Sequence, residues 1–283
     1  MKLSDRALIV RLTISQWSAR KYDRKASEQV AAANGTTMEA GRYNKALLPM
    51  NDGLKKIMAA SNMLRAHVYA NTLPWAHDGQ FILPTTRYLG FITEYRKLKG
   101  MFDNLVGEFL SDYNDVKDNA RLALGSLYDD ADYPSASDLL RKFNVDLEVM
   151  PVPTNDFRVE IASDELSRIQ ADVTSRVEAA QSQAMQAAWH RLFDRVQHMA
   201  TTLSKDNPRI YDSMVDHIRD LCSTLTDLNF TDDPNLESMR QEVERKLGSQ
   251  PVDVLREDEE HRKAVAETAE DIMARMRGFM GAA

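Results

Sequence analysis

The sequence has few of the residues that interrupt helices or cross-link a chain. Of its 283 residues, only 11 are glycine, 9 are proline and one is cysteine. So few breakers favour long helices over a β-sandwich, in which turn signals recur about every 8 to 12 residues. The lone Cys222 excludes an intramolecular disulfide. Its position beside Leu221 and Leu225 predicts a buried thiol in a reducing compartment.

Long hydrophobic runs are also missing. No segment reaches the roughly 18 apolar residues that a membrane-spanning helix needs. The first apolar run, 7–10, is too short for a secretory signal and is interrupted by Arg11. We therefore expect a cytoplasmic protein with no membrane partner.

The motifs of common enzymes are not present. The sequence contains no GxxxxGK[ST], GxGxxG, HExxH or GxSxG pattern. The pairs Asp194/His198 and Asp258/His261 could each supply two metal ligands, but contacts of this kind are more typical of a solvated helix surface. The sequence predicts a non-enzymatic protein with no cofactor and no metal site.

Positive charge is scarce: 36 basic residues against 43 acidic ones give a net charge of −7. This balance argues against nucleic acid as a partner, because contact with the phosphate backbone needs clustered Lys and Arg. The local exception is the basic segment formed by Arg20, Lys21, Arg24 and Lys25. It is either a solvated helix face or a nucleic-acid site.

The first predicted region, 1–84, is helical with a strand at its start. The β-branched run 7–14 predicts the strand, and Ser15 is a suitable N-cap for a helix over 16–33. A second helix is predicted over 52–70, capped by Asn51 or Asp52.

The segment 73–84 closes this region. It contains two prolines and an Asp-Gly pair, which favour turns. We predict an ordered loop anchored by Trp75 and Phe81.

Two long apolar stripes dominate the second region, 85–204. Over 85–124, large apolar side chains recur at spacings of three and four, a heptad seam in which Asp112 is the one polar break. Over 163–204, apolar residues recur on average every 3.7 residues. We predict two long helices packed antiparallel, either within one protomer or between several.

The segment that joins these helices, about 125–162, is predicted to form a small α/β tip. A short helix is expected over 135–143, with strands over 145–150 and 157–161. This strand pair could also accept the strand at 7–14.

The third region, 205–283, is predicted to contain three helices, over 208–228, 234–247 and 252–280. The fold class is therefore mostly α. We expect a long antiparallel, coiled-coil-like helical hairpin with a small β element at its tip and flanking helices.

The most distinctive residues are concentrated in the first region. They occur in the segments Ile14-Ser15-Gln16-Trp17-Ser18-Ala19-Arg20-Lys21-Tyr22-Asp23, Ala40-Gly41-Arg42-Tyr43-Asn44-Lys45, Leu73-Pro74-Trp75 and, later, Pro151-Val152-Pro153. These segments resemble a family of bacteriophage and integrative-element proteins of unknown activity. The resemblance implies the cytoplasm of a bacterial host cell and a genetic setting beside genes for a MoxR-like AAA+ ATPase and a von Willebrand A-type protein. Such an ATPase is therefore a candidate partner.

Seven residues of these motifs form a candidate interaction patch: Trp17, Arg20, Tyr22, Arg42, Tyr43, Lys45 and Trp75. Arginine and aromatic side chains are favoured anchors at protein interfaces. The alternative is structural. In that case the aromatic residues pack the loop at 71–84 onto the first helix, and the arginines hydrogen-bond the carbonyls of the loop.

The leading hypothesis is a non-enzymatic helical interaction or assembly protein of a phage or mobile element, either an adaptor for an AAA+ ATPase or a homo-oligomer. The alternative is an accessory protein that handles nucleic acid in recombination or defence evasion, through the basic segment. The third hypothesis is membrane action, with the tip at about 145–161 as an inserting segment, although its five charged residues make insertion costly. An enzyme whose motif cannot be read from the sequence is the fourth.

Overall fold

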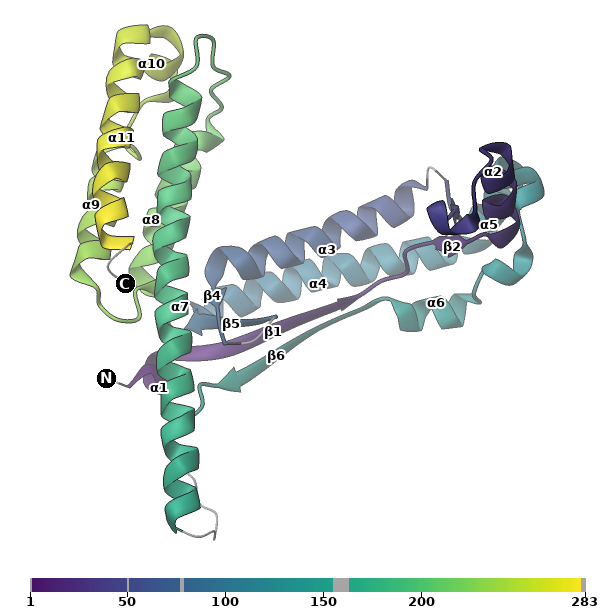
Figure 1. Ribbon diagram of the computed structural model, residues 1–283, viewed down its shortest axis with the longest axis horizontal. Coiled ribbons are helices and arrows are strands. Elements are labelled where there is room, and N and C mark those ends of the chain that lie inside the picture. The colour runs from purple at the N-terminus through teal and green to yellow at the C-terminus, as the bar shows by residue number, and fades with distance from the viewer. Residues whose placement is uncertain (1, 50, 77–78, 155–162, 281–283) are drawn as a thin grey trace. The chain divides into compact units, whose positions relative to one another are not determined.

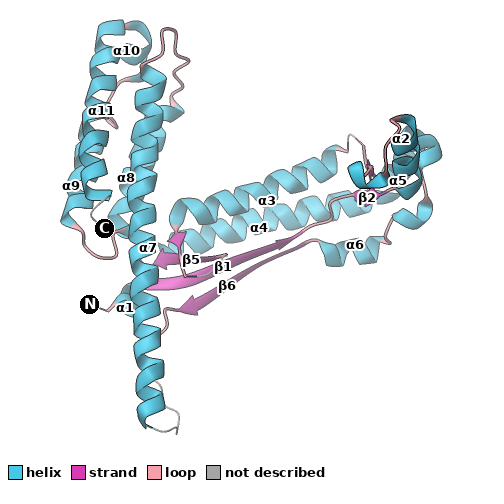
Figure 2. Cartoon of the chain, viewed as in Figure 1, coloured by secondary structure: helices cyan, strands magenta, loops and turns pink. Residues whose placement is uncertain are grey.

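The structure, a computed structural model, describes residues 2–49, 51–76, 79–154 and 163–280. It is mostly helical, with eleven α-helices in these ranges and a small sheet (Figures 1 and 2). The chain divides into two compact units. Unit 1 comprises Met1–Leu12, His67–Ile92 and Leu147–Ala283, and unit 2 comprises Thr13–Ala66 and Thr93–Asp146. The three consecutive regions expected from the sequence do not coincide with these units, because each unit is assembled from segments distant in sequence.

A four-stranded sheet has the strand order β4-β5-β1-β6. The strands are β1 (Ala7–Ser15), β4 (Leu73–Pro74), β5 (Gln80–Pro84) and β6 (Asn144–Pro151). β5 pairs antiparallel with both β1 and β4, and β6 lies on the other side of β1 (Figure 2).

The strands predicted over 7–14 and 145–150 are confirmed, together with their membership of one sheet. The loop predicted over 73–84 is wrong, because the apolar run Phe81-Ile82-Leu83 forms β5 and pairs with β1. The second strand expected in the tip, 157–161, lies outside the described residues.

Both faces of β1 are buried at its start, in unit 1. Ala7 and Ile9 of β1 belong to the core that also contains α7 (Ser163–Leu203). Val10, the next residue along β1, packs instead with Val68 and Phe91. Successive side chains of a strand point to opposite faces, so a strand covered on both sides has no polar alternation. This explains the uninterrupted apolar run at 7–10.

Four helices of unit 1 lie side by side in Figure 1: α7, α8 (Ser213–Leu228), α9 (Pro234–Lys246) and α11 (Glu259–Met280). The longest packing is between α7 and α11. Ala184 and Ala188 of α7 and Ala269 of α11 are fully buried in the shared core. Small side chains let two helix backbones approach closely, so the alanine-rich stripe of α7 has a partner in α11.

The helices predicted over 163–204 and 234–247 are confirmed. Asp233 caps α9: its Oδ1 accepts hydrogen bonds from the backbone N–H groups of Asn235 and Leu236, at 2.9 and 3.4 Å. Cys222 is fully buried on α8, as predicted. Its Sγ lies 3.7 Å from the Arg240 carbonyl oxygen.

Two helix boundaries predicted in the region 205–283 are wrong. The helix predicted from Pro208 begins at Ser213. Ile210 is buried, and its carbonyl oxygen accepts a hydrogen bond from Arg256 Nε at 2.9 Å, which holds this segment outside the helix. The helix predicted over 252–280 divides into α10 (Val252–Glu257) and α11. The break is at Asp258, whose Oδ1 accepts a hydrogen bond from the backbone N–H of His261 at 2.9 Å.

Helices α3 (Asp52–Asn71) and α4 (Tyr88–Ser111) lie side by side and run antiparallel (Figure 1). A methyl group at Gly53 would lie 3.3 Å from the Phe109 ring. Towards the other end, the His67 and Phe91 rings stack at 4.8 Å. The helix predicted over 52–70 is thus confirmed. Asn51 is its cap, since Asn51 Oδ1 accepts a hydrogen bond from the Leu54 N–H at 2.8 Å.

The predicted hairpin between the helices at 85–124 and 163–204 is not confirmed. The apolar face of α4 lies against α3, and α7 packs along α11, so each stripe has a partner that periodicity alone did not indicate. The prediction of one unbroken helix over 85–124 is wrong at Asp112, where α4 ends and α5 (Tyr113–Leu124) begins.

The helix predicted over 16–33 is wrong in its first half. β1 continues to Ser15, a short strand β2 (Arg20–Tyr22) follows, and α2 (Arg24–Ala33) begins only after Asp23. Ala19 has a φ of +48°, which an α-helix cannot contain. Asp23 caps α2 in place of Ser15, because its Oδ1 accepts a hydrogen bond from the Ala26 N–H at 2.9 Å.

Shorter elements complete the described chain: α1 (Leu3–Arg6), α6 (Ala136–Lys142), β3 (Asn44–Ala46) and the 3-10 turns Met38–Ala40, Thr85–Arg87, Gly125–Leu127 and Asp130–Asp132. α6 confirms the helix predicted over 135–143. Within the described ranges, no helix combines the length and the apolar character needed to cross a membrane.

Candidate interaction surface

Two short strands of unit 2 carry three residues of the predicted patch, Arg20, Tyr22 and Lys45. β2 pairs antiparallel with β3 in the register Arg20↔Ala46, Lys21↔Lys45 and Tyr22↔Asn44. Hydrogen bonds from the Leu47 N–H to the Ala19 carbonyl (2.7 Å) and from the Asp23 N–H to the Tyr43 carbonyl (3.0 Å) extend the pairing at both ends. We call this pair of strands the ribbon.

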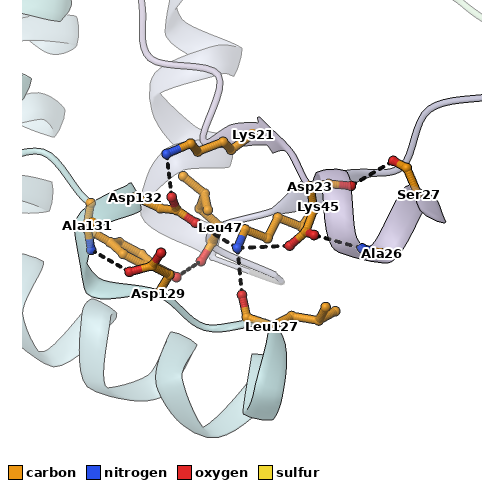
Figure 3. Close-up of polar contacts among 11 residues, drawn as sticks. Lys21, Asp23, Ala26, Ser27, Lys45, Leu47, Leu127, Asp129, Ala131 and Asp132 are labelled. Atoms are coloured by element: carbon orange, nitrogen blue, oxygen red, sulfur yellow. Dashed lines mark hydrogen bonds and ion pairs between the residues drawn. The ribbon is translucent and has the colours of Figure 1, made fainter. Parts of the chain in front are cut away.

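The centre of the ribbon places two lysines opposite each other. Like charges in this position destabilise a strand pair. Asp132 removes the conflict, because its Oδ1 lies 2.5 Å from Lys21 Nζ and its Oδ2 lies 2.7 Å from Lys45 Nζ (Figure 3). Asp132 therefore offsets the repulsion between the two lysines in this register. It lies 111 residues after Lys21 in the sequence.

Lys45 lies at the centre of this cluster (Figure 3), with its side chain only 7% exposed. Its ammonium group contacts Asp23 Oδ2 at 3.2 Å and Asp132 Oδ2 at 2.7 Å, and it donates a hydrogen bond to the Leu127 carbonyl oxygen at 2.7 Å. The ammonium group is thus surrounded by two carboxylates and a carbonyl oxygen, with which it makes two ion pairs and one hydrogen bond.

The lysines and the carboxylates of the cluster each favour the charged form of the other. Burial alone would lower the pKa of Lys45, but Asp132 and Asp23 outweigh it and raise that pKa above its ordinary value. Burial alone would raise the pKa of Asp132, but Lys21 and Lys45 hold it below its ordinary value. A lysine held in its charged form has no lone pair for nucleophilic or base chemistry. The contacts of the cluster instead position the ribbon.

Helix α2 is tied to the ribbon through Asp23 and Ser27. The hydrogen bond from Ala26 N–H to the Asp23 carboxylate, with help from Lys45, lowers the pKa of Asp23. Ser27 is buried; its hydroxyl donates to the Asp23 carbonyl at 2.7 Å and accepts from the Tyr43 N–H at 2.9 Å. The ribbon and the start of α2 thus form one hydrogen-bonded piece (Figure 3).

Four residues of the predicted patch are exposed on this piece: Arg20, Tyr22, Arg42 and Tyr43. We call them the ribbon surface. The Arg42 guanidinium lies 5.9 Å from the centre of the Tyr22 ring, a cation–π contact. Tyr22 and Tyr43 are 41% and 39% exposed, which is high for aromatic side chains.

A shallow pocket adjoins the ribbon surface. It has a volume of about 280 Å³ and is lined by Arg42 and Tyr43 together with residues of α2 and the segment after it, among them Val30 and Ala31. Val30 is 51% exposed. The surface therefore combines cations, aromatic rings and an apolar hollow.

The other three predicted residues are buried. Lys45 lies beneath the ribbon surface, in the ion cluster. Trp17 is in the core of unit 2, in edge-to-face contact with Tyr113 at 6.3 Å between ring centres. Trp75 is 4% exposed in the core of unit 1. The sequence motif thus contains both exposed and buried residues, and only the exposed ones are available to a partner.

Two residues that hold the ribbon are not in the predicted patch. Asp23 could have been found as a cap, since Asp followed by a helical segment is a common N-terminal signal. Asp132 could not, because nothing local to the 3-10 turn Asp130–Asp132 indicates that it meets Lys21 and Lys45.

No group of three or more His, Cys, Asp or Glu side chains in the described part of the chain is placed to hold a metal ion. No known protein family, curated protein or solved structure matches the chain.

Proposed function

We propose that the protein is a non-enzymatic interaction protein of a phage or mobile element, and that the ribbon surface is its contact site. The observation that carries the proposal is the position of Tyr22, Arg42 and Tyr43, which lie exposed together on a piece of backbone held by a buried ion cluster. Aromatic and arginine side chains that are fixed in place lose little entropy on binding, which is why they dominate interface energies.

The charge of the ribbon surface indicates an acidic partner. Neither Arg20 nor Arg42 has a carboxylate partner among the described residues. A surface carboxylate of a partner would give each arginine a charge-assisted hydrogen bond. The resemblance stated above makes a MoxR-like AAA+ ATPase of the same genetic element the first partner to test, with this chain as its adaptor.

The test is co-purification with that ATPase, followed by a binding titration. We expect Arg42→Glu and Tyr22→Ala each to weaken binding at least tenfold, since an interface anchor contributes more than about 1.4 kcal/mol. Lys56→Glu is the matched control. Lys56 is exposed on α3, outside the ribbon, and the substitution changes the charge by the same amount as Arg42→Glu. Equal binding by all three variants would contradict the assignment of the ribbon surface.

A homo-oligomer is the other form that an assembly protein can take. Light scattering after size exclusion over a hundredfold range of concentration distinguishes the two forms. If the protein is a fixed oligomer and Arg42→Glu dissociates it, the ribbon surface binds a second copy of the chain. A monomer at all concentrations supports the adaptor.

Nucleic-acid handling through the basic segment is the second candidate function. Within the segment, Lys21 is paired with Asp132, and Arg24 with Glu28 at 2.9 Å. Only Arg20 and Lys25 lack a carboxylate partner among the described residues, so the segment offers less positive charge than its sequence suggests. Fluorescence polarisation with labelled DNA and RNA at low salt tests it, and an Arg20→Gln/Lys25→Gln variant should then lose the binding.

A further inference from the structure

A second concave surface, in unit 1, has a different chemistry. It lies where α7 ends, along the segment that follows it, and where α8 begins, and its volume is about 510 Å³. Five of its lining residues can carry positive charge: Arg195, His198, Lys205, Arg209 and His217. We call it the basic pocket.

The basic pocket contains no carboxylate. None of its lining residues is Asp or Glu, although the chain has 43 acidic residues and a net charge of −7. Four acids are next to lining residues in sequence. Asp212 pairs with Arg256 at 3.0 Å and Asp216 with Arg219 at 2.9 Å, while Asp194 and Asp206 are not among the residues that line the pocket. Positive charge is therefore gathered on the lining of this hollow.

The cations of the basic pocket have no partners of their own. In the part of the chain that the structure describes, Arg195, Lys205 and Arg209 make no ion pair, whereas most other arginines on the helices of unit 1 do. Three like charges facing one hollow repel one another. An anion bound among them would relieve this repulsion and accept charge-assisted hydrogen bonds from each.

The remaining lining groups suit a phosphate that bears an aromatic group. Thr202, Asn207 and Ser213 can donate hydrogen bonds to phosphate oxygens. Tyr211 is 64% exposed at the pocket, and an exposed aromatic ring beside phosphate-binding cations is the arrangement on which nucleobases stack. The volume lies in the range of about 300 to 1,000 Å³ that is typical of small-ligand sites.

We propose that the basic pocket binds a nucleoside phosphate, with the phosphate among Arg195, Lys205 and Arg209 and the base against Tyr211. The ligand is either a free nucleotide or one nucleotide of a single strand, because both present the same phosphate and base. The site shares no residue with the ribbon surface, so either assignment can fail without the other.

The test is a set of titrations of the full chain at low salt, with AMP, ATP, inorganic phosphate and a fluorescein-labelled twelve-nucleotide oligothymidylate as probes. We expect saturable binding of a mononucleotide, the oligonucleotide or both. Arg209→Gln and Arg195→Gln should each weaken it roughly tenfold, the effect of losing one charge-assisted hydrogen bond. Tyr211→Ala should weaken the nucleotide probes and leave inorganic phosphate unchanged.

The control is Arg245→Gln. Arg245 is exposed on α9 and likewise makes no ion pair among the described residues, so its loss should not alter binding. Mononucleotide binding would identify a small-ligand site, and binding of the oligonucleotide alone would identify a single-strand site. No binding of any probe, or binding that Arg195→Gln and Arg209→Gln weaken no more than Arg245→Gln does, would overturn the proposal. Circular dichroism confirms that each variant is folded.

Discussion

Replacing Lys45 by methionine should destabilise unit 2 far more than replacing an exposed lysine. Lys45→Met keeps most of the length of the side chain but removes the ammonium group that contacts Asp23, Asp132 and the Leu127 carbonyl. Asp132 is only 4% exposed, so its carboxylate would remain in a site that water barely reaches.

The size of the effect follows from what is left behind. Removing one partner of a buried ion pair costs about 3 to 5 kcal/mol, because the other charge stays buried. Lys21 still contacts Asp132 Oδ1 and compensates in part. We therefore expect Lys45→Met to lower the free energy of unfolding by about 2 to 4 kcal/mol, a large share of the roughly 5 to 15 kcal/mol of a typical protein.

The assay is urea unfolding followed by circular dichroism, with Lys55→Met as the control. Lys55 pairs with Asp52 at 3.0 Å, but both side chains are exposed, at 66% and 82%, so the control should change the free energy by less than about 1 kcal/mol. The double variant Lys45→Met/Asp132→Asn should be more stable than Lys45→Met, because it no longer buries a carboxylate that has lost its buried partner. A Lys45→Met effect no larger than that of Lys55→Met would refute the reasoning.

Three further predictions concern unit 1. Arg275 lowers the pKa of Glu242 from 4.5 to about 2, so the stabilisation from this carboxylate is complete above pH 4.5 and is lost as the pH falls towards 2. In Arg275→Gln, the free energy of unfolding should therefore depend less on pH between pH 4.5 and 2 than in the unaltered protein. The same dependence on pH in both proteins would contradict this. Burial raises the pKa of the Cys222 thiol to about 12, so Ellman's reagent should react with it only in urea. Asp233→Ala removes the cap of α9 and the 3.1 Å hydrogen bond from Trp189 Nε1, which should cost about 1 to 3 kcal/mol in thermal unfolding; a loss below 0.5 kcal/mol would be too small for both contacts.

The elements that local signals determine were predicted well. The strand at 7–14 follows from its apolar and β-branched side chains. The helices capped by Asn51 and Asp233 follow from hydrogen bonds within three residues. The buried state of Cys222 likewise follows from its apolar neighbours on one helix.

The predictions that failed depend on contacts distant in sequence. Periodicity showed that 85–124 and 163–204 have apolar faces, but not that α3 covers the first and α11 the second. The first half of the helix predicted over 16–33 is a strand instead, because Lys21 lies opposite Lys45 in the ribbon. Asp132 neutralises this lysine pair, and it is 111 positions from Lys21 in sequence. The basic pocket was missed for a similar reason, since its cations come from a helix end, a connecting segment and the start of the next helix.

The most direct test of the central claim is photo-crosslinking from the ribbon surface in bacterial cells in which the protein occurs naturally. p-Benzoylphenylalanine replaces Tyr22 in one strain and Leu122 in another, because Leu122 is also in unit 2 and is 84% exposed. We expect one defined covalent adduct from position 22, identified by mass spectrometry, and none from position 122. No adduct from position 22, or the same adducts from both positions, would contradict the assignment of the ribbon surface as the contact site.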